Sequence, residues 1–194
     1  MAVAEKLANA RMRAIRALAL AALVGLCVAP ASAAEGFSLR SFFVGKSVSA
    51  GEIRTLALFG ERFTAGFSGS VSGDELDLDE RFRFADGERL QRWHLTERDG
   101  RLAGTVLTED GEGRLQGPFP VSGTAGPGGA TLRYRGIAPG GGRFQLEFRH
   151  EMTPRGDGTV ENRVRASRFG LPLARATVTF AKSAEALETH LSDP

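Results

Sequence analysis

Cysteine, histidine and long apolar runs are scarce in this chain of 194 residues. It contains one cysteine and three histidines, so it predicts neither a disulfide framework nor a histidine-rich metal site. The Gly- and Pro-rich segment 122–129 (SGTAGPGG) contains neither a spaced GxGxxG nor a Lys-Ser/Thr pair, so we interpret it as a loop and not as a phosphate-binding site. We therefore expect no metal and no cofactor, and we assign no catalytic residue.

The first 33 residues have the pattern of a secretory signal peptide. A short apolar stretch, 17–29, precedes the small-residue cleavage site Ala31-Ser32-Ala33, and it is too short to span a bilayer. Leu26 stands where a lipoprotein signal needs a small residue before Cys27, so lipid anchoring is not expected. Four basic residues form the positive region before the apolar stretch: Lys6, Arg11, Arg13 and Arg16. These features predict a periplasmic protein that loses its cysteine on export.

Removal of this segment changes the net charge of the chain. The whole chain has a formal net charge of +2, and loss of the four basic residues and Glu5 leaves −1. The basic character is thus largely a targeting signal, and composition favours no nucleic-acid partner. The remainder predicts one barrel domain, 34–182, followed by a short helix and tail, 183–194.

Residues 75–84 alternate between polar and apolar side chains, which is typical of a half-buried strand. Asp86-Gly87 favours a tight hairpin turn that would place Ala85 opposite Glu88. The same count predicts four further pairs: Glu80 with Trp93, Leu78 with Leu95, Phe82 with Gln91, and Asp79 with His94.

Similar turn signals recur roughly every ten residues. Together with Asp86-Gly87, the turns at Ser72-Gly73, Asp99-Gly100 and Asp110-Gly111 would connect five strands with one common inner face. The predicted pairs include Phe67 with Leu78, Ala65 with Glu80, Phe63 with Phe82, Trp93 with Val106, Leu95 with Gly104, Val106 with Leu115, and Leu102 with Phe119. Later segments continue the alternation: Phe144, Leu146 and Phe148 share a face, a strand runs over 159–168, and Ser183 caps a helix that ends at His190. We predict an all-β fold, a single antiparallel up-and-down barrel of about eight to ten strands resembling lipocalins.

Several polar side chains are expected inside the barrel, and Glu80 is the one carboxylate on its apolar strand face. A few polar groups among apolar walls suit a small hydrophobic or lipid-like ligand. Small inward residues such as Ala65, Gly69, Gly104 and Gly117 favour a cavity. The candidate ligand-binding residues are Glu80, Phe82, Gln91, Trp93, Tyr134 and Asn162, and His150 is expected on the same inner face.

Two other interpretations of this interior remain open. The polar groups could satisfy one another inside a filled barrel that serves as a ligand-free envelope protein. Alternatively, burial could raise the pKa of Glu80 so that it serves as the general acid or base of a lipid-modifying enzyme.

The outer face carries many arginines on the later strands. Such a face could rest on an anionic membrane surface, or it could simply be solvated. Asp79 and His94 are predicted to form an exposed ion pair. The outward arginines are Arg133, Arg135, Arg149, Arg163, Arg165 and Arg175.

Three motifs together resemble the bacterial family catalogued as domain of unknown function 3833: FFVG at 42–45, DELDLDERFRFADGE followed by RWHL, and NRVRASRFGLPLARATVTF. The resemblance covers nearly all of the chain after residue 33 and implies a lipocalin-like fold in the cell envelope, without an activity. Segment 148–152 (FRHEM) departs from the more acidic, tryptophan-containing version of the family, which leaves the role of that strand open. The matching positions are Gly45, Glu80, Phe82, Asp86, Gly87, Trp93, Asn162, Phe169 and Gly170.

Overall fold

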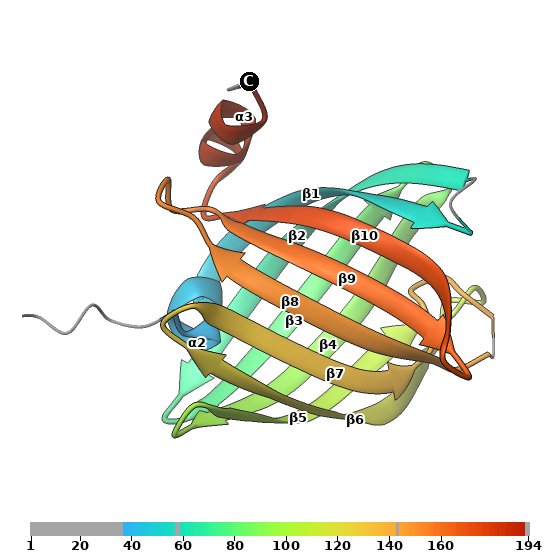
Figure 1. Ribbon diagram of the computed structural model, residues 1–194, viewed down its shortest axis with the longest axis horizontal. Helices are drawn as coiled ribbons and strands as arrows, with labels where there is room; N and C mark the ends of the chain where they lie inside the picture. The colour runs from blue at the N-terminus through green and yellow to red at the C-terminus, as the bar shows by residue number, and fades with distance from the viewer. Residues whose placement is uncertain (1–36, 57–58, 143, 193–194) are drawn as a thin grey trace, which may run out of the picture. The chain divides into compact units, whose positions relative to one another are not determined.

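The computed structural model describes residues 37–56, 59–142 and 144–192, and the predicted signal peptide with Cys27 lies outside the described residues. Ten antiparallel strands form one closed barrel in which each strand pairs with its sequence neighbours and β1 pairs with β10 (Figure 1). The all-β, up-and-down prediction is confirmed. The strands are β1 (Gly45–Thr55), β2 (Phe59–Ser72), β3 (Glu75–Phe84), β4 (Gly87–Arg98), β5 (Arg101–Glu109), β6 (Leu115–Gly126), β7 (Gly129–Gly136), β8 (Leu146–Pro154), β9 (Val160–Arg168) and β10 (Leu171–Ala181).

A five-residue helix, α2 (Leu39–Phe43), closes one end of the barrel, the left end in Figure 1. Its Leu39 and Phe43 are buried, and the Phe43 ring lies 5.2 Å from Phe67 and 5.4 Å from Phe180 between ring centroids. Lys182 donates to the backbone oxygens of Phe42 and Val44 at the end of this helix. The sequence pattern did not predict α2, because so short a helix shows no apolar period.

The predicted C-terminal helix is present as α3 (Ala184–Ser192). Ser183 caps it, since its Oγ accepts a hydrogen bond from the backbone N–H of Ala186 over 3.2 Å. The helix contacts β1 and β10, and His190 Nδ1 lies 2.7 Å from Asp157 Oδ2. It therefore packs beside the barrel, while α2 covers the end.

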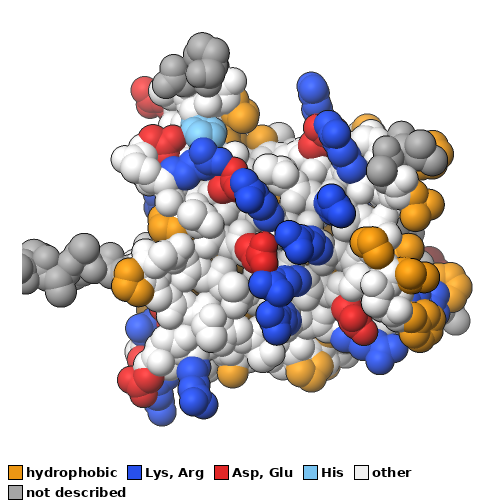
Figure 2. All heavy atoms as spheres, viewed as in Figure 1, with side chains coloured by type: hydrophobic (Ala, Val, Ile, Leu, Met, Phe, Trp, Pro, Cys, Tyr) orange, Lys and Arg blue, Asp and Glu red, His pale blue; other side chains and the backbone are white. Residues whose placement is uncertain are grey.

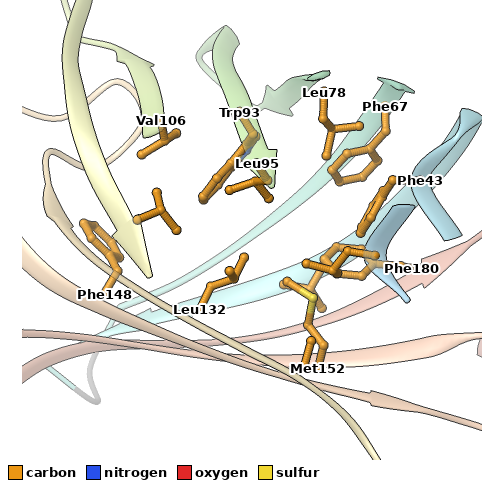
Figure 3. Packing of buried hydrophobic residues seen from close by; sticks show 14 of the residues in the cluster. Phe43, Phe67, Leu78, Trp93, Leu95, Val106, Leu132, Phe148, Met152 and Phe180 are labelled. Carbon is orange, nitrogen blue, oxygen red and sulfur yellow. The ribbon is translucent and has the colours of Figure 1, made fainter. Parts of the chain in front are cut away.

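Apolar side chains from the strands converge on the barrel interior. Figure 3 shows Trp93, Leu95 and Leu78 facing Leu132, Met152 and Phe180 across it. All of these side chains are buried, because alternate residues of each strand point inward. The inner face predicted from alternation is therefore confirmed for these strands.

The predicted register of the β3–β4 hairpin is wrong by two residues. Phe84 pairs with Gly87, so the turn residues are Ala85 and Asp86, and the positive φ of +136° falls on Gly87 after the turn. The hydrophobic pattern could not reveal the error, because a shift of two keeps every side chain on its face. The observed pairs are Glu80 with Gln91, Leu78 with Trp93, Phe82 with Arg89, and Asp77 with His94, in place of those predicted.

The β2–β3 hairpin shows the same two-residue error, whereas the β4–β5 hairpin is as predicted. Ser72 pairs with Glu75 around a Gly73-Asp74 turn. Asp99 and Gly100 both have positive φ, which is the conformation that a tight two-residue hairpin requires. In the first hairpin Phe67 faces Glu80 and Ala65 faces Phe82; in the second, Trp93 faces Val106 and Leu95 faces Gly104.

Two predictions around β6 are also wrong. Val106 pairs with Phe119 and Leu102 with Gly123, because residues 110–114 form a wider loop in which Asp110 Oδ1 accepts from the backbone N–H groups of Glu112 and Arg114. The expected loop 122–129 is instead the β6–β7 hairpin. Glycine is needed there for close strand approach, since a Cβ on Gly123 would lie 1.9 Å from a backbone oxygen.

Candidate ligand-binding cavity

A cavity of about 490 Å³ occupies the half of the barrel away from α2. Its walls are mainly apolar and aromatic side chains, including Phe63, Phe82 and Phe148. The exposed residues Asp86 and Arg175 also line it, so it reaches the surface at the end where β3 turns into β4. We call this end the mouth. The volume lies within the range that small-molecule sites occupy.

Three polar side chains, Glu80, His150 and Asn162, form the floor of the cavity. They also line a much smaller void of about 40 Å³ beneath it, on the side of α2. Their strands place them there because β3, β8 and β9 each direct alternate residues inward.

The floor is only partly satisfied by its own hydrogen bonds. Trp93 Nε1 donates to Glu80 Oε2 over 3.1 Å, and Asn162 Nδ2 lies 3.3 Å from His150 Nδ1. His150 Nε2 and Asn162 Oδ1 are buried without a partner among the described residues. Because Nδ1 accepts from the Asn162 amide, the ring proton is on Nε2. The floor thus has one unused donor and one unused acceptor.

Burial keeps the floor uncharged at neutral pH. It raises the pKa of Glu80 to about 8, and the hydrogen bond from Trp93 opposes that rise. Burial lowers the pKa of His150 to about 4. Glu80 is therefore protonated and His150 neutral at pH 7, and this interior offers hydrogen bonds without a net charge.

Gln91 and Tyr134 line the cavity wall above the floor. Gln91 Nε2 donates to Thr108 Oγ1 over 2.8 Å, so its amide orientation is fixed. The Tyr134 ring stacks on Phe148 with centroids 4.8 Å apart and meets Trp93 edge-on at 5.4 Å. Burial raises the pKa of Tyr134, so its hydroxyl is not ionised.

The structure brings together five of the six predicted binding residues: Glu80, Phe82, Gln91, Tyr134 and Asn162 all line the cavity. Trp93 lies one layer deeper, beside the small void. The inward glycines do not supply the space. A Cβ on Gly69 would lie 2.1 Å from the Phe43 carbonyl oxygen, and one on Gly104 would lie 2.0 Å from that of His94.

Sequence reasoning missed one cationic residue of the mouth, Arg89. It lines the cavity and bonds Asp86 Oδ2 through Nη2 over 3.1 Å. Its odd number gives it the inward parity of Gln91 and Trp93, and this parity could have identified it.

The predicted ion pair of Asp79 with His94 is wrong, because of the register shift described above. His94 Nδ1 lies 2.8 Å from Asp77 Oδ1, while Asp79 pairs with Arg92 at 3.3 Å. The hydrogen bond to Asp77 raises the pKa of His94. Within the described ranges, no group of three or more potential metal ligands occurs, and no helix is long and apolar enough to cross a membrane.

Residues 27–182 match the sequence model of a protein family, described as "Protein of unknown function (DUF3833)". The chain belongs to this family. No curated protein matches it. The family description assigns no activity, so a function has to be argued from the cavity itself.

Proposed function

We propose that the barrel binds a small, mainly apolar molecule that carries one uncharged polar group. The cavity with two unpartnered polar atoms at its floor carries this proposal. Buried polar groups normally have hydrogen-bond partners, so an unused donor and an unused acceptor on two side chains of the floor indicate a site for a ligand group.

The floor selects the kind of polar group. A hydroxyl or an amide both donates and accepts, which matches His150 Nε2–H and Asn162 Oδ1. A carboxylate or an ammonium group would lose its hydration there without gaining an opposite charge. We therefore propose a fatty alcohol, a fatty amide or a similar amphiphile, with its polar end at the floor.

The first experiment is native mass spectrometry of residues 34–194 purified without detergent, which should show a retained apolar molecule. The emission of Trp93, the one tryptophan of the chain, should then report the binding of dodecanol and dodecanamide at pH 7. A protein with no adduct and no response to any alkyl probe would overturn the proposal in favour of a ligand-free barrel.

Variants of neighbouring residues locate the site. Ala176 lines the cavity, whereas Thr177 on the same strand is exposed. Ala176→Phe should abolish dodecanol binding, and the matched Thr177→Phe should leave it unchanged. Equal effects of the two substitutions would place binding elsewhere.

His150→Phe tests the role of the floor, because it keeps a planar ring and removes the donor. It should weaken dodecanol binding about tenfold, since an unmade buried hydrogen bond costs on the order of 1 to 3 kcal/mol. Dodecanoate, whose charged end would stay at the mouth beside Arg89 and Arg175, should be affected little. An equal loss of affinity for dodecanol and dodecanoate would contradict a contact between His150 and the polar end of dodecanol.

The raised pKa of Glu80 also supports a second candidate, a lipid-modifying enzyme that uses this carboxyl as a general acid. Glu80→Gln separates the two functions. Both kinds of protein should keep their affinity for the ligand when the amide replaces the carboxyl. Only an enzyme should then lose a turnover that the natural protein shows.

We further propose that the protein is exported to the periplasm, on the pattern of residues 1–33. Amino-terminal sequencing of protein released from the periplasm should begin at Ala34. A chain that keeps Met1 in the cytoplasm would refute this location.

A further inference from the structure

Five arginines stand directly opposite one another on the outer wall of the barrel. They cross β7, β8, β9, β10 and β1, because each is the register partner of the next. We call this row the arginine ladder: Arg133, Arg149, Arg165, Arg175 and Arg54. At a strand spacing of about 4.8 Å the row is about 19 Å long.

Few carboxylates neutralise the ladder. Arg54 pairs with Glu52 at 2.9 Å and Arg149 with Glu151 at 2.6 Å. No described carboxylate lies within 4.0 Å of the other three guanidinium groups, Arg133, Arg165 and Arg175. Like charges directly opposite each other in a sheet repel. An external anionic partner would relieve this repulsion, and a surface depression of about 740 Å³ lined by four ladder arginines gives such groups access.

Exposed apolar side chains are gathered at the mouth on the same side of the barrel. They come from the β1–β2 connection and the start of β2, from the segment before β8, and from the β9–β10 turn. We call them the apolar rim: Leu56, Phe59, Phe144, Phe169 and Leu171, each between 57% and 80% exposed. Figure 2 shows hydrophobic side chains collected at the right-hand end and basic ones in a band across the visible face.

The rim is held in its exposed arrangement. The Arg168 guanidinium lies 4.7 Å from the centre of the Phe144 ring and 5.0 Å from that of Phe169. Phe169 occupies a turn with a φ of +52°, a position that more often carries a small polar residue. An exposed patch that gathers several large apolar side chains, as this rim does, is typical of an interaction surface.

We propose that the apolar rim and the arginine ladder together dock the barrel on an anionic lipid bilayer. Arg165 and Phe169 are four residues apart, as are Leu171 and Arg175, so the ladder lies about 13 Å behind the rim. Apolar groups of surface-bound proteins enter the bilayer by about 5 to 10 Å. With the rim inserted and the barrel tilted onto β8–β10, the long arginine side chains reach the phosphate layer.

The charge on the opposite wall favours the same orientation. β3 is five strands from β8 in both directions around the ring, and its outer face carries Glu75, Asp77 and Asp79 in the half beside α2, followed by Arg81 and Arg83 toward the mouth. The half of this wall that carries the carboxylates therefore points away from an anionic surface on which the ladder rests. A nucleic acid would use the ladder but has no counterpart for the rim, whereas a bilayer uses both. The mouth then opens toward the lipid that would supply an apolar ligand, although docking itself does not depend on ligand binding.

Vesicle binding tests the proposal with the compact unit Ala34–Pro194. Phosphatidylcholine vesicles with about a third phosphatidylglycerol should bind it, and vesicles of pure phosphatidylcholine should bind far less. The double variant Arg165→Gln, Arg175→Gln should lose about 30-fold in affinity, at about 1 kcal/mol for each arginine near the surface. The matched control, Arg81→Gln with Arg101→Gln, removes the same charge from other strands and should change affinity less than about twofold, because those positions are remote from the surface.

Insertion of the rim is tested by its own probe. Phe169→Trp should show blue-shifted emission when anionic vesicles are added, and Val71→Trp, at the end of β2 beside α2, should not. Equal losses in the two arginine pairs, an unshifted Phe169→Trp, or preferential binding to RNA would each overturn the proposal. A protein that docks on vesicles but retains no ligand would refute only the binding function proposed above.

Discussion

Trp93 donates a hydrogen bond to Glu80 over 3.1 Å, although the residue directly opposite Trp93 on β3 is Leu78. The bond is therefore diagonal, across two positions of the partner strand, which is within the reach of an aromatic side chain. It joins the single indole of the chain to the carboxyl group at the cavity floor. The charge of that carboxyl group is consequently accessible to a spectroscopic measurement.

The emission of Trp93 should titrate with a midpoint near pH 8. Burial raises the pKa of Glu80 to about 8, and its deprotonation places a negative charge beside the indole N–H. A fluorescence titration from about pH 3.5 to about pH 10 covers both this midpoint and the ordinary glutamate value of 4.5, and Glu80→Gln should remove the transition. A midpoint at the ordinary value for glutamate would show that the floor is hydrated.

Stability should fall as the pH rises from about 6.5 to 8. Folded Glu80, with its raised pKa, keeps its proton across this range whereas the unfolded chain does not, so the contribution is complete below the unfolded value of 4.5 and is lost through 8. His150 has the opposite sign: its contribution is complete above 6.5 and is lost as the pH falls through about 4. Between 4.5 and 6.5 the two slopes oppose each other, and above 6.5 only that of Glu80 remains.

Urea unfolding at several pH values should therefore show a decrease of about 2 kcal/mol between pH 6.5 and 8 in the natural protein. Glu80→Gln should lack this decrease, and groups common to both proteins cancel in the difference. If the free energy of unfolding changed with pH in the same way in both proteins, the pH dependence would not come from Glu80.

Gly69→Ala should destabilise the barrel by about 2 kcal/mol, because the new Cβ would lie 2.1 Å from the Phe43 carbonyl oxygen and displace α2. The matched change Gly66→Ala, on the same strand, meets no atom within 4 Å and should be neutral or slightly stabilising. Thermal unfolding of both variants checks this prediction. Similar melting temperatures would show that α2 moves without cost.

Asp77→Asn should lower the pKa of His94, since the bond between these side chains raises it. Asp79→Asn serves as the control and should have much less effect, because Asp79 pairs with Arg92. An NMR titration of the imidazole protons distinguishes the two. The reverse ranking would support the register counted from the Asp86-Gly87 turn.

Alternation along the strands was sufficient to predict the barrel and the inward position of Glu80, Gln91 and Asn162. It could not determine register, because pairings that differ by two residues bury the same side chains. Register depended on turns whose geometry is not fixed by the dipeptide alone. Asp99-Gly100 forms the expected two-residue turn, whereas Asp86-Gly87 does not.

Contacts that depend on the register between strands, or on the helix at the closed end, were beyond the sequence pattern. The bond between Asn162 and His150 depends on the β8–β9 register, and the depth of Trp93 depends on α2 filling the closed end. The arginine ladder was visible only as a set of outward residues, since five successive pairings are needed to place its members in one row.

The pairing of β1 with β10 has a consequence for biogenesis. Every other pairing joins consecutive strands and can form as a local hairpin, whereas this one joins residues 48–55 to residues 174–181. Its loop-closure entropy is the largest in the fold, and it cannot form until the chain is complete to the last strand. A chain that ends before Leu171 would be an open sheet with two unpaired edges, free to pair with other copies. The pairing of the last strand thus decides whether the chain forms a closed monomeric barrel or remains an open sheet that aggregates.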